Sequence, residues 1–130
     1  MGLVIRPRLA HFEPNADVFV NDGTATAVVT VEVAGADPES LRIEIDDERG
    51  LLISGRRREP DRSRAGSFAQ KEIAYGDFAK RVHLPIAVEC DGATATYADG
   101  VLAITLTLAP TAYRPTSRTE IHMIVKRIPW

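Results

Sequence analysis

Three histidines and one cysteine have the widest chemical repertoire in this sequence. His11, His83 and His122 lie on separate segments, and no two of them have the spacing of ligands in a metal site. Cys90 with a histidine would imitate a nucleophilic dyad, but no nucleophile signature surrounds it, and one cysteine cannot make an internal disulfide. The simpler interpretation of Cys90 is a small, buried or half-buried side chain.

Carboxylates and phosphate-binding patterns give no stronger catalytic signal. The adjacent pair Asp46 and Asp47 falls at an expected turn, where both carboxylates are expected to be solvated. Neither G-x-x-x-x-G-K-S/T nor G-x-G-x-x-G occurs. Residues 56–64 contain five arginines that would attract phosphate, but Glu59 and Asp61 are interleaved and no aromatic ring stands among them to stack bases. The sequence therefore predicts neither an enzyme nor a cofactor.

Composition and charge narrow the class of protein. The 130 residues fit one domain, and a hydrophobic content of 45% is typical of a globular chain. A net charge of -2 argues against a dedicated nucleic-acid-binding protein. No apolar run approaches the roughly 20 residues of a membrane-spanning helix, and residues 1–10 lack the apolar core and cleavage site of a secretion signal. We therefore expect a cytoplasmic protein that binds neither membranes nor nucleic acid.

The elements that position these residues are strands, because apolar and polar side chains alternate with period two along most of the chain. The clearest case is 101–108, where every second residue is Leu or Ile. Asp99-Gly100 just before it has the composition of a tight turn that needs positive φ. About eight short strands are expected, at 17–21, 26–33, 41–46, 51–54, 67–74, 78–84, 93–97 and 101–108.

This pattern, which contains no long helical stripe, predicts an all-β protein with an immunoglobulin-like two-sheet β-sandwich. Residues 56–66 are highly charged and poor in apolar side chains, which is typical of a solvated loop. We expect three parts: a short N-terminal arm at 1–13, one domain at 14–109, and a C-terminal extension at 110–130 that contains two prolines and then an apolar cluster.

Four segments of this pattern, taken together and in order, resemble the small heat-shock protein family, also called the Hsp20 or α-crystallin domain family. The last hairpin resembles its A-x-x-x-x-G-V-L signature through Ala95, Gly100, Val101 and Leu102. The other three segments resemble its G-x-F…L-P, L-x-I-S-G and glycine-turn motifs, at residues 76–85, 51–55 and 35–43. The resemblance covers residues 14–109 and implies the α-crystallin type of β-sandwich.

Two positions depart from the family pattern. Ala34 stands where the family has a proline before the turn glycine. Lys80 stands where the family has an arginine, with Arg81 beside it. Because lysine cannot donate two parallel hydrogen bonds as arginine does, we expect a weaker contact at residue 80.

The resemblance implies a holdase, an ATP-independent chaperone without catalysis that binds unfolding proteins and suppresses their aggregation. It also implies a strand-swapped homodimer, in which the charged loop reaches across to the partner and adds a strand to its sheet. The residues expected at this interface are Arg64, Ala65, Gly66, Ser67, Phe68, Ala69 and Lys80. The competing interpretation is an ordinary flexible loop.

Two terminal segments would complete the assembly that the resemblance implies. The family ends with an I-x-I/V pair that docks on a neighbouring dimer and builds higher homo-oligomers, and the candidates here are Ile121 with Met123, or Ile128. A tail folded on its own domain is the alternative. In the N-terminal arm, an apolar group either contacts unfolded client proteins or covers a groove of its own chain: Leu3, Val4, Ile5, Leu9 and Phe12.

Other β-sandwich proteins also fit the strand pattern. A p23/CS-like co-chaperone would grip one specific partner with a sheet face and would be monomeric. The long charged loop and the apolar tail favour the small heat-shock interpretation, because a monomeric co-chaperone needs neither. A sandwich with a purely structural role is the third alternative.

Overall fold

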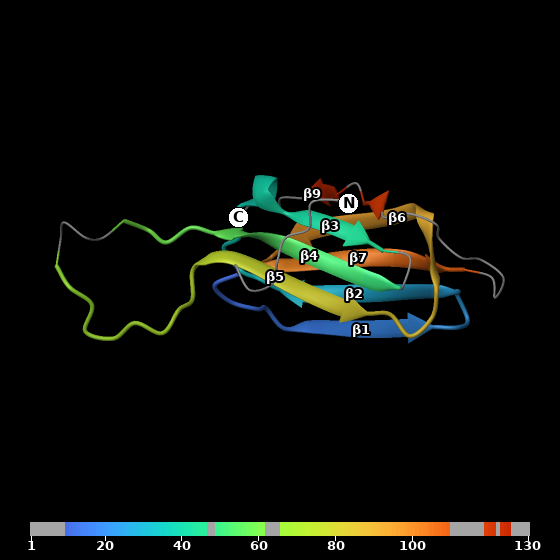
Figure 1. The fold of residues 1–130 in the computed structure, drawn as a ribbon, viewed down its shortest axis with the longest axis horizontal. Helices are drawn as coiled ribbons and strands as arrows, with labels where there is room; N and C mark the ends of the chain where they lie inside the picture. Colours follow the sequence, from blue (N-terminus) through green and yellow to red (C-terminus); the bar gives the residue numbers. More distant parts are fainter. Residues whose placement is uncertain (1–9, 47–48, 62–65, 110–118, 122, 126–130) are drawn as a thin grey trace.

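The computed structural model describes residues 10–46, 49–61, 66–109, 119–121 and 123–125. Its strands form two sheets packed face to face, as predicted, and a short 3-10 turn, η2 (Pro38–Ser40), precedes the second sheet (Figure 1). The five-stranded sheet has the order β1 (Ala16–Asn21), β2 (Thr26–Glu32), β7 (Val101–Leu108), β6 (Val88–Ala98) and β9 (Met123–Val125). The four-stranded sheet has the order β5 (Gly76–His83), β4 (Gly50–Arg57), β3 (Arg42–Ile45) and β8 (Thr119–Glu120).

The alternation in the sequence sets the buried face of each sheet. Strand β2 pairs antiparallel with β7, and this register places Val29 opposite Ile104 and Val31 opposite Leu102. All four side chains are fully buried, whereas their neighbours on the outer face are not. The four-stranded sheet contributes fully buried side chains to the same core, among them Ile43, Ile45, Leu51, Ile53 and Phe78. Each such aliphatic side chain contributes roughly 1.5–3 kcal/mol on burial, so the core holds the two sheets together.

The expected tight turn joins β6 to β7. Asp99 and Gly100 have φ angles of 54 and 78 degrees, so the predicted positive φ at Gly100 is confirmed. Two central residues with positive φ match the twist of the strands on either side. The turn also contacts the segment that follows β2, because the Val33 N–H donates to the Gly100 carbonyl at 2.9 Å.

A tyrosine fixes the same segment against the five-stranded sheet. The Tyr97 hydroxyl donates to the Val33 carbonyl at 2.8 Å and accepts from the Ala36 N–H at 3.1 Å. Both contacts span more than sixty residues of sequence, so Tyr97 joins the end of β6 to the connection between β2 and η2. This connection forms one side of the root of the long loop between β4 and β5.

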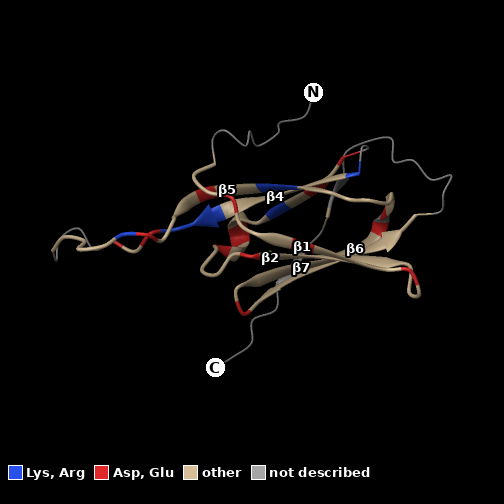
Figure 2. Cartoon of the chain, turned by 90° about the horizontal axis from the view of Figure 1, so that it is seen from below, with Lys and Arg blue, Asp and Glu red and all other residues tan. Residues whose placement is uncertain are grey.

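The strand expected at 67–74 is not present, and this corrects the sequence analysis. Residues 58–75 instead form a long loop that extends beyond the sandwich, with its described parts at 58–61 and 66–75 (Figures 1 and 2). Strands β4 and β5 already pair with each other as far as Arg57 and Gly76, so the loop begins where their ladder ends. A segment that extends past its neighbouring strands has no edge beside it on which to complete a strand.

Candidate functional site

The long loop (residues 58–75) exposes apolar side chains in its described parts. Its large apolar side chains Phe68 and Ile73 are 51% and 61% exposed. Glu59 and Lys71 join the two legs of the loop by an ion pair of 3.2 Å. Loops of this length without regular structure are uncommon in compact domains and are usually functional.

The predicted interface residues divide between this loop and other places. Gly66, Ser67, Phe68 and Ala69 are exposed on the loop, whereas Arg64 and Ala65 lie outside the described residues. Lys80 lies on β5 opposite the buried Ile53, which places its side chain on the inner side of the sheet. There it pairs with Glu13 at 3.6 Å, in the segment before β1. Lys80 is therefore close to Glu13 of its own chain and not to the exposed loop residues.

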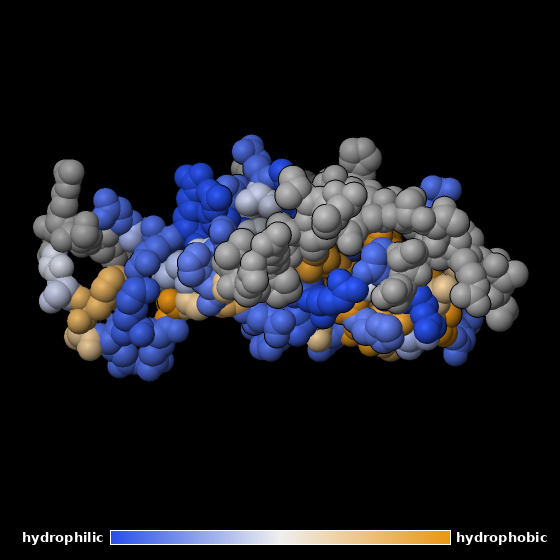
Figure 3. Space-filling model, viewed as in Figure 1, coloured by the Kyte–Doolittle hydropathy of each residue, from blue (hydrophilic) through white to orange (hydrophobic). Residues whose placement is uncertain are grey.

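Strand β1 is the open edge of the five-stranded sheet. Strand β2 lies on one side of it, and among the described residues no strand lies on the other. Val18 and Phe19, on opposite faces of β1, are 38% and 65% exposed. In Figure 3 apolar surface appears along the lower right border, where Figure 1 places β1, and again on the long loop. An unpaired edge with apolar side chains is a template for pairing with another chain.

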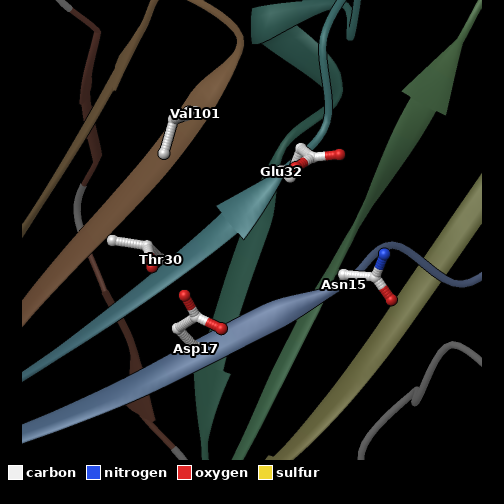
Figure 4. Close-up of a pocket in the computed structure, with 5 residues that line it drawn as sticks. All are labelled: Asn15, Asp17, Thr30, Glu32 and Val101. Atoms are coloured by element: carbon white, nitrogen blue, oxygen red, sulfur yellow. The ribbon is translucent and has the colours of Figure 1, made fainter.

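A pocket of about 200 Å³ lies beside this edge, on the outer face of the sheet, and two of its lining residues are acidic (Figure 4). It is lined by Asn15, Asp17, Thr30, Glu32 and Val101. Strands β1, β2 and β6 contain acidic residues, and neither they nor β7 contain Lys or Arg. Lys and Arg lie instead on β3, β4 and β5, at Arg49 just before β4, and on the long loop, as Figure 2 shows for β4, β5 and the loop. The described part of the loop also contains Glu59, Asp61 and Glu72, so the loop has charges of both signs.

The C-terminal tail lies on its own chain. Thr119 and Glu120 pair with β3, and the Ile121 N–H donates to the Ile43 carbonyl at 3.0 Å. Ile121 is 5% exposed and belongs to the core, while β9 continues as a parallel strand beside β6. The tail therefore connects the edges of both sheets, which is the alternative of a tail folded on its own domain.

The structure describes only some of the other candidate residues in the tail and the N-terminal arm. Met123 lies in β9, and Ile128 lies outside the described residues. Phe12 is half-buried, with its ring centroid 5.4 Å from that of Phe78, so its described contacts are structural. The other apolar residues of the N-terminal arm are not among the described residues: Leu3, Val4, Ile5 and Leu9.

Three of the four family-signature residues have structural roles, two in the core and one in a turn, and the fourth is exposed. Ala95 and Leu102 are buried in the core, at 1% and 0% exposure. Gly100 makes the turn between β6 and β7. Val101 is 38% exposed and lines the pocket beside the open edge.

Sequence reasoning missed three residues: Phe19 on the open edge, Asp17 in the pocket beside it, and Arg57 at the end of β4, where the long loop begins. Phe19 could have been found, because the run Val18-Phe19-Val20 is apolar on both faces and so breaks the alternation. Asp17 gave no signal, because its role depends on Glu32 of the neighbouring strand. Arg57 stood within a run of three arginines, and only the fold distinguishes it from the other two.

Two observations concern other kinds of site. Among the described residues, no group of three or more His, Cys, Asp or Glu side chains is arranged to hold a metal ion. In the same part of the chain, no helix has the length and apolarity needed to cross a bilayer.

Comparison with known sequences gives consistent matches. The model of the Hsp20/alpha crystallin family matches residues 20–123. A 19.0 kDa class II heat shock protein of Oryza sativa subsp. japonica is 32% identical over 111 residues, which cover 82% of this chain and 63% of the relative. A 22.7 kDa class IV heat shock protein of Pisum sativum is 32% identical over 79 residues, which cover 61% of this chain and 40% of the relative. The chain thus spans roughly half the length of these two relatives.

Solved structures with the same architecture include two bacterial proteins. One is a small heat-shock protein from Xylella fastidiosa with a distinct high order structure, at 29% identity and a TM-score of 0.65, covering 83% of this chain and 97% of that chain. The other is hspA from Xanthomonas axonopodis, at 29% identity and a TM-score of 0.67, covering 79% of this chain and 100% of that chain.

Proposed function

This chain belongs to the Hsp20/alpha crystallin family, and from that premise we propose that it is an ATP-independent molecular chaperone, a holdase that binds unfolding proteins and suppresses their aggregation. The observation that carries the proposal is exposed apolar surface on two elements that offer unpaired backbone among the described residues: a strand with one open edge and a loop with no strand beside it. These elements are the β1 edge, with Phe19, and the long loop, with Phe68 and Ile73. Unfolding proteins expose apolar surface, and burial of apolar surface is non-directional, so one holdase can accept many sequences.

The basic unit of this chaperone is a homodimer in which each long loop pairs with the β1 edge of the other copy. Such strand addition would satisfy the backbone hydrogen bonds of both segments and would produce a two-fold dimer. Phe68 would then pack near Phe19 of the second copy. Each large apolar side chain removed from water contributes roughly 1.5–3 kcal/mol, and the symmetry doubles every such contact.

Larger homo-oligomers would form when a tail leaves its own chain and docks on the same sheet edges of a neighbour. The proposal is supported by Ile121, which is buried beside Ile43 in its own chain and would make the same contacts in a neighbour. In this proposal residues 1–13 are an arm, 14–109 the chaperone domain and 110–130 the extension that exchanges. The protein would act in the cytoplasm, on unfolded clients, without a catalytic site.

The test is suppression of thermal aggregation of an unrelated enzyme, followed by light scattering without nucleotide. At a near-stoichiometric ratio we expect scattering to fall strongly. Full scattering with the protein in excess would refute the holdase function.

One observation favours a second candidate, a monomeric binding module of the p23/CS-like type: the tail covers one edge of each sheet within one chain. Sedimentation equilibrium separates the two candidates. A dimer or larger species supports the small heat-shock function, whereas a strict monomer at all concentrations supports the monomeric module.

A further inference from the structure

Arg57 occupies the position from which the long loop begins. It is the last residue of β4 and pairs with Gly76, the first residue of β5. Its backbone also forms a bridge with Ala36, in the connection that follows β2. Arg57 therefore lies where both legs of the loop join the sandwich, and its contacts can affect the direction of the loop.

The Arg57 guanidinium joins segments that are far apart in sequence. Its Nε donates to the Ala74 carbonyl at 2.9 Å, and its Nη2 donates to the same oxygen. Its Nη1 donates to the Ala34 carbonyl at 3.1 Å. One fork of donors thus holds the returning leg of the loop against the connection between β2 and η2, a geometry that lysine cannot reproduce.

Aromatic rings complete the surroundings of this side chain. Arg57 Cζ lies 4.4 Å from the centroid of the Phe12 ring and 5.7 Å from that of Tyr75. A guanidinium over an aromatic face within about 6 Å is attracted by the ring, and more strongly when it is partly desolvated. Arg57 is half-buried, so these contacts add to the hydrogen bonds and limit the movement of Tyr75 at the end of the loop.

The returning leg is also restricted where it enters β5. Gly76 has φ of 102 degrees, and a β-carbon there would lie 2.5 Å from His11 Nδ1. Farther out, an ion pair between Glu59 and Lys71 joins the legs. Its side chains are 39% and 42% exposed, and ion pairs of that kind contribute little. Arg57, with its three hydrogen bonds and two ring contacts, therefore holds the root of the loop more firmly than this exposed ion pair does.

We propose that Arg57 is a positioning residue for assembly, which fixes the long loop in a direction that suits pairing with the β1 edge of a second copy. The inference rests on the proposed function, because it assumes the loop-swapped dimer. A loop that is already ordered loses less conformational entropy on pairing. A two-fold dimer contains two such loops, so each change at Arg57 acts twice.

The first experiment compares Arg57→Ala and Arg57→Lys with Arg58→Ala in the full chain. Arg58 is exposed and adjacent, so its replacement removes the same charge from the same strand end. Sedimentation equilibrium gives the dimer dissociation constant, and far-UV circular dichroism checks the fold. Both Arg57 variants should raise the dissociation constant about tenfold or more, whereas Arg58→Ala should stay within about threefold.

The second experiment measures the loop itself. Spin labels at Ser67 and Asp22, in a Cys90→Ser background diluted with unlabelled chain, report the distance between the loop and the far end of the sandwich. We expect a narrow distribution that broadens in both Arg57 variants and not in Arg58→Ala. Unchanged widths, or Arg57→Lys behaving like the parent chain in both experiments, would overturn the inference. A parent chain that is monomeric would instead remove the proposed dimer, and the label distances would still decide whether Arg57 orients the loop.

Discussion

A methyl group added at Gly100 should destabilise the domain more than the same group added at Gly92. Both glycines have φ near 80 degrees, 78 at Gly100 and 80 at Gly92. A β-carbon at Gly92 would meet nothing within 4 Å, whereas one at Gly100 would lie 3.0 Å from the Ala34 β-carbon and 3.1 Å from its α-carbon. Gly92→Ala and Gly100→Ala therefore introduce the same backbone strain, but only Gly100→Ala also introduces a close contact with Ala34.

The structure gives the expected magnitudes. A non-glycine residue in the left-handed region costs roughly 1–2 kcal/mol, which should be the whole effect of Gly92→Ala. Overpacking against backbone adds roughly 1–3 kcal/mol, so Gly100→Ala should cost about 2–5 kcal/mol. For a chain of this size 1 kcal/mol lowers the melting temperature by about 3–5 °C, which predicts a loss of about 3–10 °C for Gly92→Ala and about 6–25 °C for Gly100→Ala.

Thermal unfolding followed by circular dichroism at one protein concentration is the assay, because self-association makes melting temperatures depend on concentration. The companion variant Ala34→Gly should recover part of the loss when combined with Gly100→Ala, since it removes the nearer contact and leaves the Ala34 α-carbon in place. Equal melting temperatures for Gly92→Ala and Gly100→Ala would show that the contact with Ala34 has no effect and would refute the reasoning.

Three further changes test other parts of the molecule. Phe19→Asp places a charge on the open edge, so dimers should weaken in sedimentation while the circular dichroism spectrum stays unchanged; dimers of full strength would remove β1 from the interface. Ile121→Asp puts a carboxylate into the core and should cost roughly 2–5 kcal/mol in thermal unfolding, whereas an unshifted melt would mean that the tail leaves its own chain in solution. Tyr97→Phe deprives the Val33 carbonyl and the Ala36 N–H of their partner and should cost roughly 1–3 kcal/mol in urea unfolding; equal midpoints would contradict this role.

The sequence predicted the elements whose structure depends on neighbours in the chain. Strand β7 was predicted with its observed bounds, because one face of it is continuously apolar and Asp99-Gly100 determines where it begins. The loop at 67–74 was predicted wrongly as a strand, because its residues have strand propensity but lack an adjacent edge. A strand exists only where backbone groups find partners, and local alternation cannot reveal whether the partner lies in the same chain.

The tail is a second case in which the sequence could not show which chain supplies the partner, although here the partner lies in the same chain. Ile121 was a docking candidate because Ile121 and Met123 resemble the family's I-x-I/V pair, but the sequence left open whether this segment docks on its own domain or on another copy. The structure seats it at the Ile43 carbonyl of the same chain. The parallel pairing of β9 with β6 joins residues nearly thirty positions apart, as in Ala95 with Met123, and no period in the sequence indicates such a register. Arg57 likewise depends on Phe12 and Ala74, whose proximity only the fold creates.

Dilution should distinguish the two proposed contacts between copies, the docked tail and the long loop paired with β1. Only the docked tail competes with an identical segment of the receiving chain itself. A tail linked to its own sheet edges through residues 110–118 meets them at an effective concentration on the order of 1 mM, which a tail from another copy must match. In the described residues the long loop has no competing strand in its own chain, so its pairing with a second β1 edge faces no such competition. Larger assemblies should therefore break down first and leave dimers, which native mass spectrometry over a dilution series would detect. Monomers that appear while larger assemblies persist would mean that the tail contacts between copies are the stronger ones, and that the long loop is not the primary interface.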